Sequence, residues 1–248
     1  MNPGVSKHLP GRRWSWRRRA FVGAAALSVV LVVILYVLFR TPDWYRPPVV
    51  APDQRQAVRN NLVNAEQAFT ESLRSGGRFV YHIHQDDLNR WIAMRREIYP
   101  LIDEIAPPVL IDPVVLFDDE EITVAGRFPI GASDVVLSLD IKPELIDDKI
   151  RLKVTSVRCG SFPMPRDFGD MGLGRRADLE AEALWPGSPA MSGDFLSGFH
   201  IDTQAWWKNG GVDYRVAGIA VRSGRLDLTI EPIGRHAVAR RSVQSLSD

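Results

Sequence analysis

The chain has 248 residues, and its 31 basic and 30 acidic side chains leave a formal net charge of +1 at neutral pH. One cysteine excludes a disulfide within the chain, so stability has to come from an ordinary hydrophobic core. The charge is uneven, because residues 1–49 carry eight basic side chains and one acidic one, whereas residues 50–248 carry 23 basic and 29 acidic ones. The larger part therefore lacks the basic excess that is typical of nucleic-acid binding.

Residues 20–39 form an apolar segment without a charge. A helix of this length, at about 1.5 Å per residue, crosses the roughly 30 Å hydrocarbon core of a bilayer. Residues 1–19 are basic and no acidic residue occurs before Asp43, so the positive-inside rule places the N-terminus in the cytoplasm. A cleaved signal peptide would have a shorter apolar core and a small-residue cleavage site, which residues 40–42 do not provide. We predict a single-pass transmembrane helix in the lipid bilayer, with Trp44 and Tyr45 as interfacial anchors.

The rest of the chain is predicted to lie outside the cytoplasm. The sequence contains no Asn-x-Ser/Thr glycosylation site, and arginine far outnumbers lysine. Both features favour the inner membrane of a bacterium, with an extracytoplasmic, periplasmic domain. Residues 40–52 contain four prolines, which favour extended backbone, so we expect a semi-rigid stalk that holds this domain off the membrane.

Two amphipathic helices are predicted after the stalk. The first covers residues 53–74, with Asp53 as its N-cap and one apolar stripe. The members of that stripe are Val58, Leu62, Ala65, Phe69 and Leu73. A strand over residues 78–84 then leads to the second helix over residues 86–99, capped by Asp86 or Asp87. Its expected apolar side includes Leu88, Trp91 and Ile92.

Apolar and polar side chains alternate from residue 109 to residue 157, which predicts antiparallel strands packed on one face. The expected strands are 122–128, 135–141, 150–154, 199–207, 212–221 and 225–230. Residues 159–198 give no clear pattern, and residues 235–248 are predicted to be a polar tail. The predicted fold class is α+β: a single N-terminal transmembrane helix followed by one extracytoplasmic domain, residues 53–234, in which amphipathic helices pack on a curved antiparallel sheet.

Few residues suggest chemistry. His82 and His84 share a strand face near Asp86, and two imidazoles with a carboxylate resemble a zinc site, but the polar face of an edge strand explains them more simply. The acidic run 118–121 lacks the alternating spacing of a calcium loop and fits a solvated turn. No serine has the G-x-S-x-G context, and Gly172-Leu173-Gly174 lies outside a strand–helix unit. We predict a non-enzymatic protein with no catalytic residue, no metal and no cofactor.

A curved sheet covered by helices either closes its core or leaves an apolar groove. Periodicity alone favours the closed core, but a groove would bind an acyl chain, which needs only apolar walls. The expected groove residues are Trp91, Ile92, Leu137, Leu139, Ile141 and Leu152. In the strand around Trp206 and Trp207, one indole is expected in the core and the other at the surface.

Two short motifs suggest a family. Residues 86–89 read Asp-Asp-Leu-Asn at the start of the second helix, and residues 160–165 read Gly-Ser-Phe-Pro-Met-Pro after a strand pair. With the single N-terminal anchor and the closing hairpin, these motifs resemble the YpmS-like family of bacterial membrane-anchored extracytoplasmic proteins, which is similar in outline to tubular lipid-binding domains. The long loop between residues 167 and 198 departs from that pattern.

This resemblance implies non-catalytic binding of a lipid or another amphiphile in the cell envelope, and it implies no catalytic residues. The alternative hypothesis is a structural or interaction module of an envelope protein complex with a closed core. In that case the exposed sheet face or Trp207 would contact the protein partner. Neither hypothesis involves nucleic acid.

Overall fold

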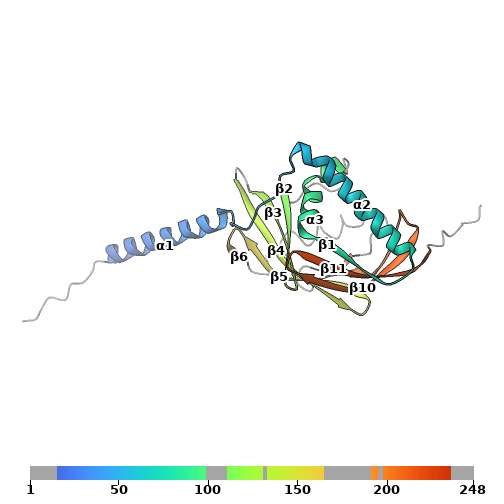
Figure 1. Ribbon diagram of the computed structural model, residues 1–248. Coiled ribbons are helices and arrows are strands. Elements are labelled where there is room, and N and C mark those ends of the chain that lie inside the picture. Colours follow the sequence, from blue (N-terminus) through green and yellow to red (C-terminus); the bar gives the residue numbers. More distant parts are fainter. Residues whose placement is uncertain (1–15, 99–110, 131–132, 165–190, 195–197, 236–248) are drawn as a thin grey trace, which may run out of the picture.

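The computed structural model describes residues 16–98, 111–130, 133–164, 191–194 and 198–235. The expected end of the second helix near Pro100, the Gly172–Gly174 motif and residues 236–248 of the predicted tail lie outside these residues. The described chain is an α+β protein with one long apolar helix and antiparallel sheets (Figure 1).

The helices follow the predicted order. They are α1 (Trp16–Phe39), the short 3-10 helix η1 (Pro52–Gln54), α2 (Arg55–Arg74), α3 (Gln85–Ala93) and α4 (Arg95–Ile98). Within α1, the stretch Phe21–Phe39 is long and apolar enough to cross a membrane, and no part of its most apolar window is buried. The second predicted helix is divided at Met94, whose φ of −96° and ψ of 6° are not helical.

The predicted helix caps were wrong. Asp53 lies inside η1, and Gln54, the N-cap of α2, makes no side-chain capping hydrogen bond. His84 is the N-cap of α3, so Asp86 and Asp87 lie in the first turn of that helix. Their negative charges still favour this position, because the N-terminal end of a helix dipole is positive.

Eleven strands are described, and every pairing between them is antiparallel. They are β1 (Phe79–His84), β2 (Ile111–Asp118), β3 (Glu121–Ile130), β4 (Ser133–Ile146), β5 (Lys149–Cys159), β6 (Phe162–Met164), β7 (Met191–Asp194), β8 (Gly198–Asp202), β9 (Gln204–Trp207), β10 (Val212–Arg222) and β11 (Arg225–Arg235). The small sheet has the order β1-β11-β10-β9. The large sheet has the order β2-β3-β4-β5-β8-β7, with β6 also paired to β5.

One segment belongs to both sheets. The predicted strand 199–207 is divided at Thr203, so that β8 pairs with β5 and β9 pairs with β10. The Thr203 hydroxyl donates a 2.7 Å hydrogen bond to the carbonyl of Asp148, and the Thr203 carbonyl accepts one of 2.9 Å from the Val216 amide. Thr203 therefore fixes the bend at which the chain passes from the large sheet into the small one.

Strand β10 lies along the turns of the large sheet. The Glu120 amide, in the β2–β3 turn, donates a 3.2 Å hydrogen bond to the carbonyl of Val221. Arg215 of β10 lies 3.8 Å from the Asp148 carboxylate in the β4–β5 turn. In Figure 1, β10 and β11 run across the lower end of the large sheet. The single curved sheet that was predicted is therefore two sheets, which meet where β10 contacts the turns of the large sheet.

Helix α2 covers one face of the small sheet through the predicted stripe. Phe69 and Leu73 are buried in a cluster with Val212 and Ile230. The Phe69 ring makes edge-on contacts with four aromatic rings, those of Phe79, Tyr81, Trp207 and Tyr214. Such contacts contribute about 0.5–1.5 kcal/mol each beyond burial. The rest of the stripe agrees with the prediction: Val58 is buried, and Leu62 and Ala65 are half-buried.

A β-bulge explains why β5 is longer than predicted. Leu139 is opposite Val157, but after a register shift at Asp140 the partner of Ile141 is Val154. The extra residue on β5 lets even-numbered and odd-numbered side chains share one face of the sheet. Leu137, Val154 and Val157 therefore form a single buried cluster on this face.

The stalk does not hold the domain away from α1. Tyr45 is only 6% exposed, and it packs against Val114, Ala125 and Val136 of three strands. Near Gly160 the β5–β6 turn meets the end of α1, where the Ser161 amide donates a 3.2 Å hydrogen bond to the carbonyl of Val37. The expected roles of the stalk as a spacer and of Tyr45 as an interfacial anchor were therefore wrong.

Candidate functional site

Most of the predicted groove residues lie on one face of the large sheet. Leu137 is buried, and Leu139 is partly buried against the same cluster. Phe128, Met164 and Phe199 pack against that cluster from neighbouring strands. Further along the strand pair, Ile141 and Leu152 are half-buried. At the end of β4 the apolar side chains come to the surface, with Leu145 40% exposed.

The two predicted helix residues are placed differently. Trp91 lines a hollow between α2 and α3, together with Val58 and Asn61 of α2. Ile92 is half-buried on the same helix. The described strand contacts of α3 are chiefly with β2, at the edge of the large sheet, and with β1. Trp91 therefore belongs to the boundary between two helices, and its predicted role in the apolar groove stays a prediction.

Asn89 of α3 binds the large sheet through two hydrogen bonds, a role that was not predicted from the sequence. Asn89 is 7% exposed, and its amide group accepts a 2.8 Å hydrogen bond from the Val115 N–H and donates one of 2.7 Å to the Val115 carbonyl. Gln85 accepts a 2.7 Å hydrogen bond from the Phe117 N–H. These bonds cover the free edge of β2, and a covered edge cannot pair with another chain.

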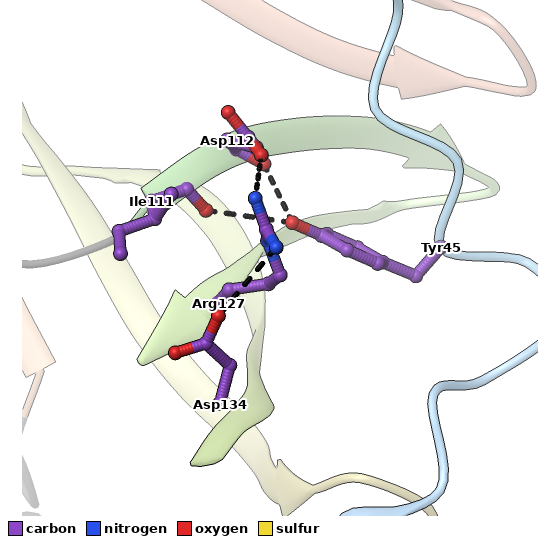
Figure 2. A network of polar contacts seen from close by, with 5 residues as sticks. All are labelled: Tyr45, Ile111, Asp112, Arg127 and Asp134. Atoms are coloured by element: carbon purple, nitrogen blue, oxygen red, sulfur yellow. Dashed lines mark hydrogen bonds and ion pairs between the residues drawn. The ribbon is translucent and has the colours of Figure 1, made fainter. Parts of the chain in front are cut away.

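The joint between the stalk and the large sheet is held by a polar network (Figure 2). The Tyr45 hydroxyl donates a 2.7 Å hydrogen bond to the carbonyl of Asp112. Arg127 forms ion pairs with the carboxylates of Asp112 and Asp134. Burial and the nearby Asp112 charge raise the pKa of Tyr45. The hydroxyl therefore stays protonated at neutral pH and available as a donor.

His82 belongs to a charged cluster on the small sheet rather than to a group of metal ligands. Its Nδ1 lies 2.7 Å from a carboxylate oxygen of Asp227, its direct cross-strand neighbour, and Arg225 lies 2.8 Å from the same oxygen. Burial raises the pKa of Asp227, but the hydrogen bond from His82 and the charge of Arg225 outweigh burial and leave it below its ordinary value. Among the described residues, no group of three or more His, Cys, Asp or Glu side chains is placed to hold a metal ion.

The other candidates have structural surroundings. The acidic run 118–121 lies at the β2–β3 turn, where Glu120 forms an ion pair with Lys142 at 2.6 Å. Burial raises the pKa of the Cys159 thiol, so the reactive thiolate is disfavoured. The indole N–H of Trp207 donates a 2.8 Å hydrogen bond to the Thr70 hydroxyl, and its ring packs against the buried cluster around Phe69. Trp207 is thus not the surface contact, and Trp206, 40% exposed, is the outer indole of the pair.

Comparisons of the chain with protein-family models, curated proteins and solved structures gave no match. The resemblance to the YpmS-like family therefore stays a prediction carried by its two motifs. Both motifs contain a residue with a defined structural role. Asn89 binds the edge of β2, and a Cβ at Gly160, where φ is +60°, would overlap the carbonyl oxygens of Val37 and Leu38.

Proposed function

We propose that this protein is anchored in the bacterial inner membrane by α1, with its N-terminus in the cytoplasm and its folded domain in the periplasm. The support is the apolar, unburied span Phe21–Phe39 together with the basic residues that precede it. A reporter enzyme fused after Asp248 tests the topology. It should be active only outside the cytoplasm, and activity inside the cytoplasm would overturn this orientation.

We further propose that the domain is not an enzyme and binds the acyl chain of a lipid or another amphiphile. The observation that carries this proposal is an apolar stripe on β4 that starts beside α1. The β5–β6 turn bonds both to the end of α1 and to the carbonyl of Val136, near the start of β4. From there Leu137, Leu139 and Ile141 share one face of the strand. From Val135 to Ile141 the stripe is about 20 Å long at about 3.3 Å per residue, comparable to the roughly 15 Å of one bilayer leaflet.

The distribution of buried residues also supports a groove. A closed domain usually has one contiguous hydrophobic core. In the part of the chain that the structure describes, most of the buried apolar residues fall into three clusters, around Tyr45, Phe69 and Leu137, while others, among them Val58, Phe117 and Val221, belong to none. Ile141 and Leu152 are half-buried and belong to none of them. These two side chains offer apolar surface for a ligand.

Photo-crosslinking tests this proposal on the full chain. The protein is reconstituted in phospholipid nanodiscs that contain a lipid with a diazirine in its acyl chain. We expect crosslinks in the segment 135–154 in addition to those in α1. Leu139→Glu should abolish the crosslinks in 135–154 because a carboxylate inside an apolar site is costly. Val63→Glu, at an apolar side chain that is 58% exposed on α2, is the matched control and should leave them unchanged.

A second variant separates an open groove from a packed core. Leu139→Trp fills an open groove and should block crosslinking without loss of stability. In a closed core the larger side chain would overpack the site, which typically costs 1–3 kcal/mol. A destabilised Leu139→Trp variant, with no crosslinks between residues 135 and 154 in the natural protein, would overturn the lipid proposal and favour an interaction module.

One observation favours that second function. Trp206 lies on β9, the last strand of the small sheet, and it is 40% exposed. Tryptophan is enriched among the residues that dominate binding energy at protein interfaces. If the core is closed, this strand is the surface that we expect an envelope partner to contact.

A further inference from the structure

The hollow between α2 and α3 has the lining of a binding site for a polar ligand. Its volume is about 240 Å³. Gln54, Val58 and Asn61 line it from the α2 side, and Asp87, Arg90 and Trp91 line it from α3. Amide, carboxylate, guanidinium and indole groups therefore converge on one small space. Drug-sized ligands occupy pockets of about 300–1,000 Å³, so this hollow fits a smaller molecule or one ring of a larger one.

The polar groups of this hollow are only loosely bonded to one another. The Asn61 amide lies 3.4 Å from an Asp87 carboxylate oxygen, and Arg90 lies 3.8 Å from the same oxygen. No described residue accepts a hydrogen bond from the indole N–H of Trp91. By contrast, Glu97 of α4 binds Arg55 of α2 at 2.8 Å, and neither residue lines the hollow. The ion pairs that join the helices are thus short, whereas the groups facing the hollow retain bonding capacity.

A second hollow, which is shallow, open to solvent and lined by α2 alone, adjoins the first. It shares Asn61 and is lined further by Asn60, Asn64 and Ala65. Asparagine is among the weaker helix formers, less favourable than alanine by several tenths of a kcal/mol in a helix interior. All three asparagines are exposed, so packing does not explain their presence in α2. The Asn60 amide oxygen accepts a 2.9 Å hydrogen bond from Gln56, and the Asn61 and Asn64 amides offer further donors and acceptors beside the first hollow.

We propose that these two hollows bind a neutral sugar chain, with one pyranose ring placed against Trp91. An indole offers a flat apolar surface to the C–H face of the ring. Carboxylate, guanidinium and amide groups each have paired atoms that can bond two adjacent hydroxyls. The opposite charges of Asp87 and Arg90 cancel, which favours a ligand without net charge. The second hollow gives the following sugar units a polar path along α2. This site is separate from the apolar stripe of β4.

Calorimetric titration tests the proposal on the full chain in phospholipid nanodiscs, because the sugar groups of alkyl glycoside detergents would compete. The probes are glucose, galactose, mannose, N-acetylglucosamine and the trimer of N-acetylglucosamine. At least one should bind with a dissociation constant of about 1 mM or tighter. Trp91→Ala and Asn61→Ala should each weaken binding about tenfold or more. Ile233→Ala, which removes an apolar side chain that is 54% exposed on β11, is the matched control and should leave affinity unchanged.

Two further measurements keep the outcome decisive. Trp91→Phe retains an aromatic surface and tests the site if Trp91→Ala fails to fold; it should bind more weakly than the natural protein and fold normally. Asn64→Ala should weaken binding of an oligomer but not of a single sugar, because Asn64 lines only the second hollow. The absence of binding by every probe, or affinities that Trp91→Phe and Asn61→Ala leave unchanged, would overturn the proposal. Inorganic phosphate bound at these residues in place of sugars would overturn it as well.

Discussion

Replacement of Asn89 by alanine should destabilise the domain, because Asn89 is a buried polar residue whose amide is hydrogen-bonded to the backbone of β2. The Asn89 amide satisfies both the N–H and the carbonyl of Val115, at 2.8 and 2.7 Å. An unsatisfied buried group costs about 1–3 kcal/mol. Val115 is half-buried, so water can replace part of the loss, and we expect about 2–4 kcal/mol in total for the two groups. For a domain of this size that equals roughly 4–16 °C in melting temperature.

Thermal unfolding of the full chain in nanodiscs, followed by tryptophan fluorescence, measures this effect. Asn64→Ala, at an exposed asparagine of α2, is the control and should change the melting temperature little or raise it slightly. Asn89→Asp keeps the acceptor for the Val115 N–H but places a carboxylate against the Val115 carbonyl. That variant should be unstable at neutral pH and recover as acid restores a donor. If Asn89→Ala melts within about 2 °C of the natural protein, less than 1 kcal/mol is lost, and the reasoning about the β2 edge fails.

Two more predictions concern the joint and the charged cluster. Gly160→Ala should open the contact with α1, seen as faster hydrogen exchange at the Ser161 amide, because its Cβ would overlap α1 carbonyl oxygens. Gly76→Ala also has positive φ but open space around it, so it should show the backbone strain without faster exchange at Ser161. The lowered pKa of Asp227 means that its contribution to stability is present above the ordinary carboxyl value, about 3.9, and is lost as the pH falls through the lower folded value. Asp227→Asn should therefore flatten the acid limb of a plot of unfolding midpoint against pH, and an unchanged limb would contradict the role of the His82–Asp227 contact.

The spacing of apolar residues predicted those helices and strands whose formation depends on residues close together in the sequence. The stripe from Val58 to Leu73 repeats at helical spacing, and apolar and polar side chains alternate in β3, β4 and the first part of β5, so these elements were expected. The extension of β5 to Cys159 was missed because the bulge opposite Asp140 reverses the alternation. A change of parity between Val154 and Val157 is visible in the sequence, and it is the signal that could have indicated the bulge.

Residues whose roles depend on distant partners were harder to predict. Tyr45 has the composition and position of an interfacial anchor, but its burial depends on three strands at least 69 residues further along the chain. Asn89 was noted only as the last residue of the Asp-Asp-Leu-Asn motif, because the pattern of a helix holds no information about an open strand edge elsewhere in the chain. In the hollow beside α2, Trp91 was assigned to an apolar wall from hydrophobicity alone. Its polar neighbours become evident only when α2 and α3 are placed side by side.

The contact between the Gly160 turn and the end of α1 also sets how far the domain can reach. A flexible linker of thirteen residues has a root-mean-square end-to-end distance of about 20 Å. A domain on such a linker would explore a large volume, so its effective concentration at any one point would be low. Residues 40–52 are instead fastened at Tyr45, and the domain itself meets the end of α1. With α1 in a bilayer, each surface of the domain would then stand at a constant height above the lipid headgroups. Such a domain could contact only those ligands and partners that lie at that fixed distance from the membrane surface.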